Sequence, residues 1–173
     1  DKSVIERHIK DFALSSTHVS TADVGAIIAE AAEAAPANSY AMVFAGHGTG
    51  WIPRDRAESS VSTLALGYDA WIPAEGAEVT RNFGESNVKL DISEIAESIE
   101  YSGIELDYIL FDACFMSNIE AVYDLRNSAK YIIASPCEIM GKGFPYHRTL
   151  PHLFGESYNL RSAAESYYLF YRD

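Results

Sequence analysis

Three short runs dominated by apolar residues stand out against a polar background. They cover residues 40–45, 108–111 and 130–134. Continuous apolar runs of this length, bounded by turn-forming residues, are typical of strands that are buried on both faces of a sheet. The sequence therefore predicts three buried strands, well separated along the chain.

Apolar residues at helical spacing occur before, between and after these runs. The first helix is expected to start at Ser20 and to stop before Pro36, and the second to start at Asp91 and to stop at Gly103. A short helix follows the second strand, and an aromatic-rich helix is expected over residues 162–171. Strands that alternate with helices predict an α/β fold, with a mostly parallel sheet and helices on both faces.

The remaining segments carry weaker patterns. Residues 52–89 are polar and irregular, which is compatible with a lid, a binding loop, a processing site or a surface hairpin without a task. Pro145 and Pro151 predict a connector before the last helix, and residues 1–19 show no pattern of a buried strand. The sequence has no internal repeats and no linkers. Residues 1–173 are therefore expected to form a single domain, either whole or part of a larger one.

Composition and charge exclude several classes of protein. Apolar residues make up 48% of the chain but form no run of membrane length, so no membrane insertion is expected. There are 13 Lys and Arg residues against 25 Asp and Glu residues, and the net charge of −12 repels nucleic-acid phosphates. Cys114 and Cys137 could form only one disulfide and have no zinc-finger spacing, so a disulfide scaffold and a structural zinc site are disfavoured.

Two reactive side chains follow predicted strands. His47 comes after the first strand and Cys114 after the second, and the ends of parallel strands meet at one edge of a sheet. An imidazole beside a thiol can act as its base, a pairing suited to acyl transfer. Gly46 and Gly48 allow close backbone approach, and the amides of Gly48 and Cys114 could stabilise an oxyanion. Taken separately, a buried small cysteine and a structural histidine are the commoner interpretation of such residues.

Two segments resemble the clostripain family of cysteine peptidases, which are relatives of caspases, legumains and gingipains. They are His47-Gly48-Thr49-Gly50-Trp51 and Phe111-Asp112-Ala113-Cys114-Phe115-Met116-Ser117. The likeness extends over about residues 40–146 and includes Ala134-Ser135-Pro136. It implies a caspase-like three-layer sandwich and a Cys/His dyad, with Cys114 as nucleophile, His47 as general base and acid, and no cofactor.

The resemblance also implies where a peptide or protein substrate binds. Family members commonly cleave after Arg or Lys, and Asp112 matches an acidic residue of the pocket for the basic side chain, although it could instead cap the following helix. Glu138 could supply a second carboxylate, whereas Lys142 stands where a carboxylate would be expected. Trp51 is a candidate for the wall of the cleft, or for packing.

Further properties follow from the resemblance alone. Family members cleave themselves after the His motif, so Arg54 and Arg56 are candidate processing sites. Some require calcium, but the sequence has no loop of spaced oxygen ligands, and a calcium requirement stays open. Such enzymes are mostly bacterial and are exported or held at the cell envelope.

Two alternatives to an active peptidase remain. Family members begin with strands that residues 1–19 do not show, so either a companion chain or segment completes the sheet, or the domain is divergent and replaces those strands. A domain of this kind could be catalytically inactive and bind peptides or partners through the same cleft. The thiol could also serve a hydrolase or transferase that is not a peptidase.

Overall fold

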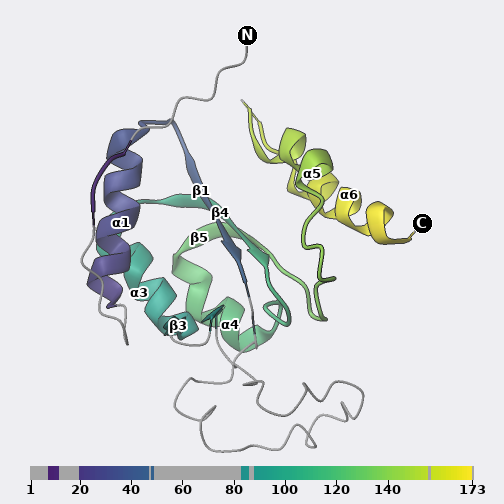
Figure 1. Cartoon of the computed structure of the whole chain (residues 1–173), viewed down its shortest axis with the longest axis horizontal. Helices are drawn as coiled ribbons and strands as arrows, with labels where there is room; N and C mark the ends of the chain where they lie inside the picture. Colours follow the sequence, from purple (N-terminus) through teal and green to yellow (C-terminus); the bar gives the residue numbers. More distant parts are fainter. Residues whose placement is uncertain are drawn as a thin grey trace, which may run out of the picture.

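A three-stranded parallel sheet forms the centre of the computed structural model, which describes residues 8–11, 20–46, 48, 83–85, 88–155 and 157–172 (Figure 1). The strand order is β1-β4-β5, with β1 at Tyr40–Ala45, β4 at Leu106–Asp112 and β5 at Ala129–Ile133. Both pairings are parallel, as predicted, and Ala45 lies in register with Asp112. The two strands that precede His47 and Cys114 therefore end side by side.

Three helices cover one face of this sheet (Figure 1): α1 at Thr21–Ala34, α3 at Ile92–Ser102 and α4 at Ile119–Asp124. Their starts agree with the sequence, since the Ser20 hydroxyl accepts the N–H of Asp23 and Asp91 forms a capping box with Glu94. A single cluster fills the interface between helices and sheet; it includes Phe44, Ile92, Ile95, Ile99, Ile109, Phe111 and Leu125.

Two further helices cover the opposite face (Figure 1): α5 at Tyr146–Leu153 and α6 at Leu160–Arg172. Their core unites Tyr108 and Leu110 of β4 with Phe144, Leu153 and Ala163. Side chains of β4 therefore alternate between two cores, as expected for a central strand. The predicted α/β sandwich with helices on both faces is confirmed.

Two details differ from the sequence prediction, and a third element was among its alternatives. β1 is buried on one face only, and Val43 is 43% exposed, because α5 and α6 pack over β4 and not over β1. The expected connector contains α5, and Pro151 lies inside this helix, two residues before its end. At the end of the irregular segment, β2 at Phe83–Glu85 pairs with β3 at Val88–Leu90 as an antiparallel hairpin, which was one of the alternatives.

Residues 8–11 form neither helix nor strand, and the rest of 1–19 lies outside the described residues. The expected absence of a strand there stays a prediction. Among the described helices, none combines the length and the hydropathy that crossing a bilayer requires.

Candidate active site

The carboxyl ends of β1 and β4 form one edge of the sheet. The N–H of Gly46, directly after β1, donates to the carbonyl of Asp112, the last residue of β4, at 3.2 Å. Cys114 follows two residues later in a turn. The sequence predicted this shared edge, and the register of β1 and β4 confirms it.

Gly48 packs directly against the turn that carries Cys114. A Cβ atom at Gly48 would lie 2.5 Å from the Cys114 carbonyl oxygen and 3.0 Å from both the Ala113 Cβ and the Met116 sulfur. Contacts at such distances do not fit any side chain, so this close backbone approach requires glycine. The backbone after position 47 is thereby held against the cysteine turn.

His47 itself lies outside the described residues, as do Trp51, Arg54 and Arg56. Its neighbours on either side, Gly46 and Gly48, both contact the end of β4 or the turn after it. The predicted Cys/His pairing and the predicted role of Trp51 stay predictions.

Cys114 is half-buried and free, and among the described residues the nearest polar group to its sulfur is the peptide of Ile139. The N–H of Ile139 points at Sγ with an N···S distance of 3.3 Å, and the Ile139 carbonyl oxygen lies 3.9 Å from the same sulfur. Phe115, the next residue, has φ +61°, a left-handed conformation that is uncommon for an aromatic residue. Such local strain is often found where the backbone presents a reactive side chain.

An extended segment lies alongside this turn. The N–H of Phe115 donates to the Cys137 carbonyl at 3.1 Å, and the N–H of Ser117 donates to the Ser135 carbonyl at 3.0 Å. Together with the Ile139 contact, these bonds form a ladder that fixes the segment after β5 beside the thiol. Cys137 is exposed, and it contributes to this ladder through its backbone rather than its side chain.

Asp112 is buried and its carboxylate has several donors. The N–H of Phe144 lies 3.1 Å from both carboxylate oxygens, and the Tyr146 hydroxyl donates to Oδ2 at 2.8 Å. Gly143 has φ +66°, and a Cβ there would come within 2.8 Å of Oδ2. These bonds tie the loop before α5 to the end of β4. A role of Asp112 in holding a basic substrate side chain stays a prediction.

Sequence reasoning did not identify Tyr146 and Ile139 as partners of this edge. Burial raises the pKa of Tyr146, and the hydrogen bond and charge of Asp112 raise it further, so the hydroxyl is a proton donor at neutral pH. Neither residue shares a motif or a spacing with Asp112 or Cys114, so only the fold brings them together. Glu138 and Lys142, on the same loop, are both exposed.

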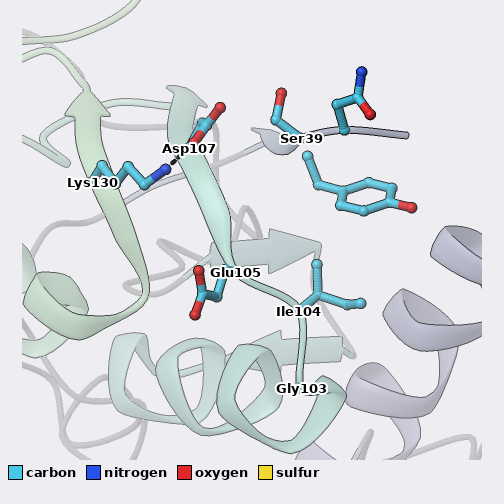
Figure 2. A pocket seen from close by; sticks show the side chains of 8 residues that line it. Ser39, Gly103, Ile104, Glu105, Asp107 and Lys130 are labelled. Carbon is cyan, nitrogen blue, oxygen red and sulfur yellow. Dashed lines mark hydrogen bonds and ion pairs between the residues drawn. The ribbon is translucent and has the colours of Figure 1, made fainter. Parts of the chain in front are cut away.

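The other end of the sheet has a different character. Figure 2 shows a hollow of about 240 Å³ at the amino ends of the strands, lined by Asn38, Ser39, Tyr40, Gly103, Ile104, Glu105, Asp107 and Lys130. Lys130 Nζ lies 2.6 Å from Asp107 Oδ1, and this hydrogen bond lowers the pKa of Asp107 and raises that of Lys130. No thiol or imidazole lines it. Across the described part of the chain, no three His, Cys, Asp or Glu side chains gather as a metal site would need.

The chain is similar to solved structures of bacterial peptidases. One is the secreted C11 cysteine protease "iotapain" of Bacteroides thetaiotaomicron, with 30% identity and a TM-score of 0.72 over 88% of this chain. A secreted C11 protease of the same organism, in complex with an irreversible peptide inhibitor, has 33% identity and a TM-score of 0.65 over 88% of this chain. An inactive zymogen C11 protease from Parabacteroides distasonis has 32% identity and a TM-score of 0.64 over 88% of this chain.

These likenesses confirm the predicted caspase-like fold. They cover 40%, 37% and 36% of the three solved chains, so the present chain spans less than half of their length. A search of curated proteins gave no match. The clostripain family model matches residues 15–173, which include the whole described site. The chain therefore belongs to the clostripain family.

Proposed function

We propose that this chain carries the catalytic centre of a cysteine endopeptidase, with Cys114 as nucleophile and His47 as general base and acid. The observation that supports this most strongly is the position of the thiol. It is half-buried at the carboxyl edge of a parallel sheet, faces a backbone N–H, and lies beside the strand end that leads into His47. A thiol of purely structural use would need none of these features.

The reaction proposed here has two steps. The His47 imidazole takes the proton of Cys114, and the sulfur attacks the carbonyl carbon of the scissile peptide bond. The N–H groups of Gly48 and Cys114 stabilise the oxyanion that forms. The C–N bond then breaks as the imidazolium protonates the leaving amine, which leaves a thioester. Water, deprotonated by His47, attacks the thioester and releases the acid and the thiol.

The same proposal includes a preference for cleavage after Arg or Lys. Asp112 is a buried carboxylate two residues before the nucleophile, Glu138 lies on the adjoining loop, and the net charge of −12 attracts cationic peptides. Lys142 on that loop opposes a basic side chain. We therefore expect a preference that is weaker than in a pocket lined by carboxylates only, with Trp51 as the proposed aromatic wall.

A library of peptides that vary at the cleaved residue tests this function. Turnover is expected for peptides with Arg or Lys before the bond, and Cys114→Ala and His47→Ala are each expected to abolish it. Cys137→Ala is the matched control because it removes the other thiol while keeping its backbone bond to Phe115. Peptide binding without turnover would favour an inactive binding module, and turnover of small esters alone would favour a different hydrolase.

The solved relatives also support proposals on location and completeness. Two of them are described as secreted, and we infer that this protein acts outside the bacterial cytoplasm or at the cell envelope. We also propose that a companion segment or chain pairs with β1. This strand is at the edge of the described sheet and leaves Ala41, Val43 and Ala45 exposed on one face. Amide hydrogen exchange tests this at the β1 N–H groups that point away from β4, because slow exchange of those groups in the chain alone would contradict it.

A further inference from the structure

A tight turn connects the thiol to the C-terminal helix. The N–H of Gly143 donates to the Met140 carbonyl at 2.7 Å, which closes a turn over residues 140–143. Ile139, whose N–H faces the Cys114 sulfur, is the residue directly before this turn. Any group that fixes the turn therefore also fixes the donor on the sulfur.

Two tyrosines of α6 hold this turn. The Tyr171 hydroxyl donates to the Gly143 carbonyl at 2.6 Å, a short and strong hydrogen bond. The Tyr167 hydroxyl oxygen faces the N–H of Met140 at 3.5 Å, a weaker contact. The Tyr167 ring also packs on Phe144 and on Tyr171, with centroid distances of 4.7 and 4.9 Å. Both ends of the turn are thus attached to one helix.

The contact at the sulfur distinguishes the two protonation states of the thiol. A backbone N–H stabilises a thiolate more than a neutral thiol, because hydrogen bonds to charged groups are the stronger ones. The carbonyl of Ile139 could accept only from the protonated thiol, but at 3.9 Å it is the more distant of the two groups. The Ile139 peptide as placed by the turn therefore favours the thiolate.

We propose that Tyr171, assisted by Tyr167, is a positioning residue that keeps the Ile139 N–H on the Cys114 sulfur and so maintains the reactive thiolate. This inference rests on the proposed function, in which that thiolate is the nucleophile. The hydroxyls of the two tyrosines hydrogen-bond to the backbone of Met140 and Gly143, so we propose that they act on the sulfur through the backbone of residues 139–143.

Other titratable groups near the thiol determine how much this donor matters. Asp112 on β4 carries a negative charge that opposes a thiolate, and Tyr146 on α5 is bound to that carboxylate. Burial raises the pKa of Tyr167 and of Tyr171, so both hydroxyls are neutral when the thiol titrates. His47, the proposed partner of the thiol, lies outside the described residues. The Ile139 N–H and the imidazole must together offset the Asp112 charge.

The test is the pH dependence of alkylation at Cys114, followed by mass spectrometry with iodoacetamide on the complete chain. Tyr171→Phe removes only the hydroxyl, and Tyr168→Phe is the matched control because Tyr168 lies on the same helix and is 62% exposed. We expect Tyr171→Phe to raise the titration midpoint of Cys114 by about half a unit to one unit, which slows alkylation roughly three- to tenfold at pH values below both midpoints. A profile that superimposes on that of Tyr168→Phe overturns the proposal.

Two comparisons separate this proposal from its alternatives. If Tyr171 were merely structural, Tyr171→Phe would lower the thermal unfolding temperature without moving the midpoint, and that result also overturns the proposal. The proposed function would still stand if peptide turnover required His47. Should Tyr171→Phe fail to fold, Tyr167→Phe is expected to shift the midpoint in the same direction, and an unchanged midpoint there decides against the proposal.

Discussion

Two aspartates at opposite ends of β4 have opposite surroundings. Asp107 lies near the amino end, beside an open hollow, and pairs with the exposed Lys130. Asp112 ends the strand and is buried, and it binds the Phe144 N–H and the Tyr146 hydroxyl. One carboxylate is partly buried and pairs with an exposed cation, whereas the other organises the loop beside Cys114.

The difference shows which end of this parallel sheet carries the candidate active site. At the carboxyl end, chain segments from β1 and from the loop after β5 meet the turn that carries Cys114, and α6 holds the adjoining turn over residues 140–143. At the amino end, one ion pair crosses an open surface. A carboxylate held by fixed donors preserves geometry, while an exposed pair contributes little to stability.

The largest effect that separates the two ends is expected from a pair of glycine substitutions. Gly48→Ala places a Cβ 2.5 Å from the Cys114 carbonyl, so the cysteine turn must move, and peptide turnover should fall about a hundredfold. Gly103→Ala at the amino end meets no atom within 4 Å but occupies a left-handed position with φ +68°. It should cost about 1–2 kcal/mol of stability and leave turnover unchanged. Equal turnover of both variants would contradict the comparison.

A smaller effect is expected when the buried carboxylate is neutralised. In Asp112→Asn the amide oxygen at the Oδ2 position can still accept from the Phe144 N–H and the Tyr146 hydroxyl, but the negative charge and the second acceptor oxygen are lost. Because hydrogen bonds to a neutral acceptor are weaker than those to a charged one, the free energy of unfolding should fall by roughly 1–3 kcal/mol, measured by urea denaturation. A variant as stable as the wild type would show that the loop before α5 is held by other contacts.

Alkaline pH is expected to lower the free energy of unfolding through Tyr146 at the carboxyl end of the sheet. The pKa of Tyr146 is raised in the folded chain, so its contribution to stability is complete below the unfolded pKa of about 10 and is lost as the pH rises above that value. Unfolding free energies measured on both sides of this pH should fall less steeply in Tyr146→Phe than in the wild type. Four other tyrosines with raised pKa values should leave some alkaline loss in the variant: Tyr108, Tyr158, Tyr167 and Tyr171. Identical slopes would rule out Tyr146 as a contributor.

The smallest effect is expected at the amino end. Asp107→Asn removes the ion pair with Lys130, whose side chain is exposed and screened by salt. Turnover and the unfolding temperature should not change measurably, and the small residual effect should vanish at high salt. A loss of turnover comparable to that of Asp112→Asn would show that both ends of β4 serve the active site.

Local signals predicted much of the fold. Ser20, Asp91 and Gly103 mark helix ends through short-range capping, and the apolar runs mark the strands. The parallel order then places the residues after β1 and β4 at one edge. These features depend on neighbours in the sequence or on a general property of parallel sheets, so they can be deduced without coordinates.

The contacts that shape the site could not be predicted in this way. Asp112 meets Tyr146, 34 residues later, and Cys114 meets Ile139, 25 residues later, and neither pair has a distinctive spacing. The exposed face of β1 was missed because an apolar run does not reveal which helices pack over it. Pro151 suggested a connector because proline usually breaks a helix, whereas α5 includes it in its last turn.

The central claim is tested most directly by the competition between the two thiols of this chain for one peptidyl electrophile that ends in arginine. Cys137 is the more exposed thiol, so accessibility alone favours it over Cys114. We predict that the electrophile labels Cys114 far faster than Cys137, and that His47→Ala removes this advantage. Faster labelling of Cys137, or a Cys114 rate that is indifferent to His47→Ala, would contradict the assignment of Cys114 as an activated nucleophile.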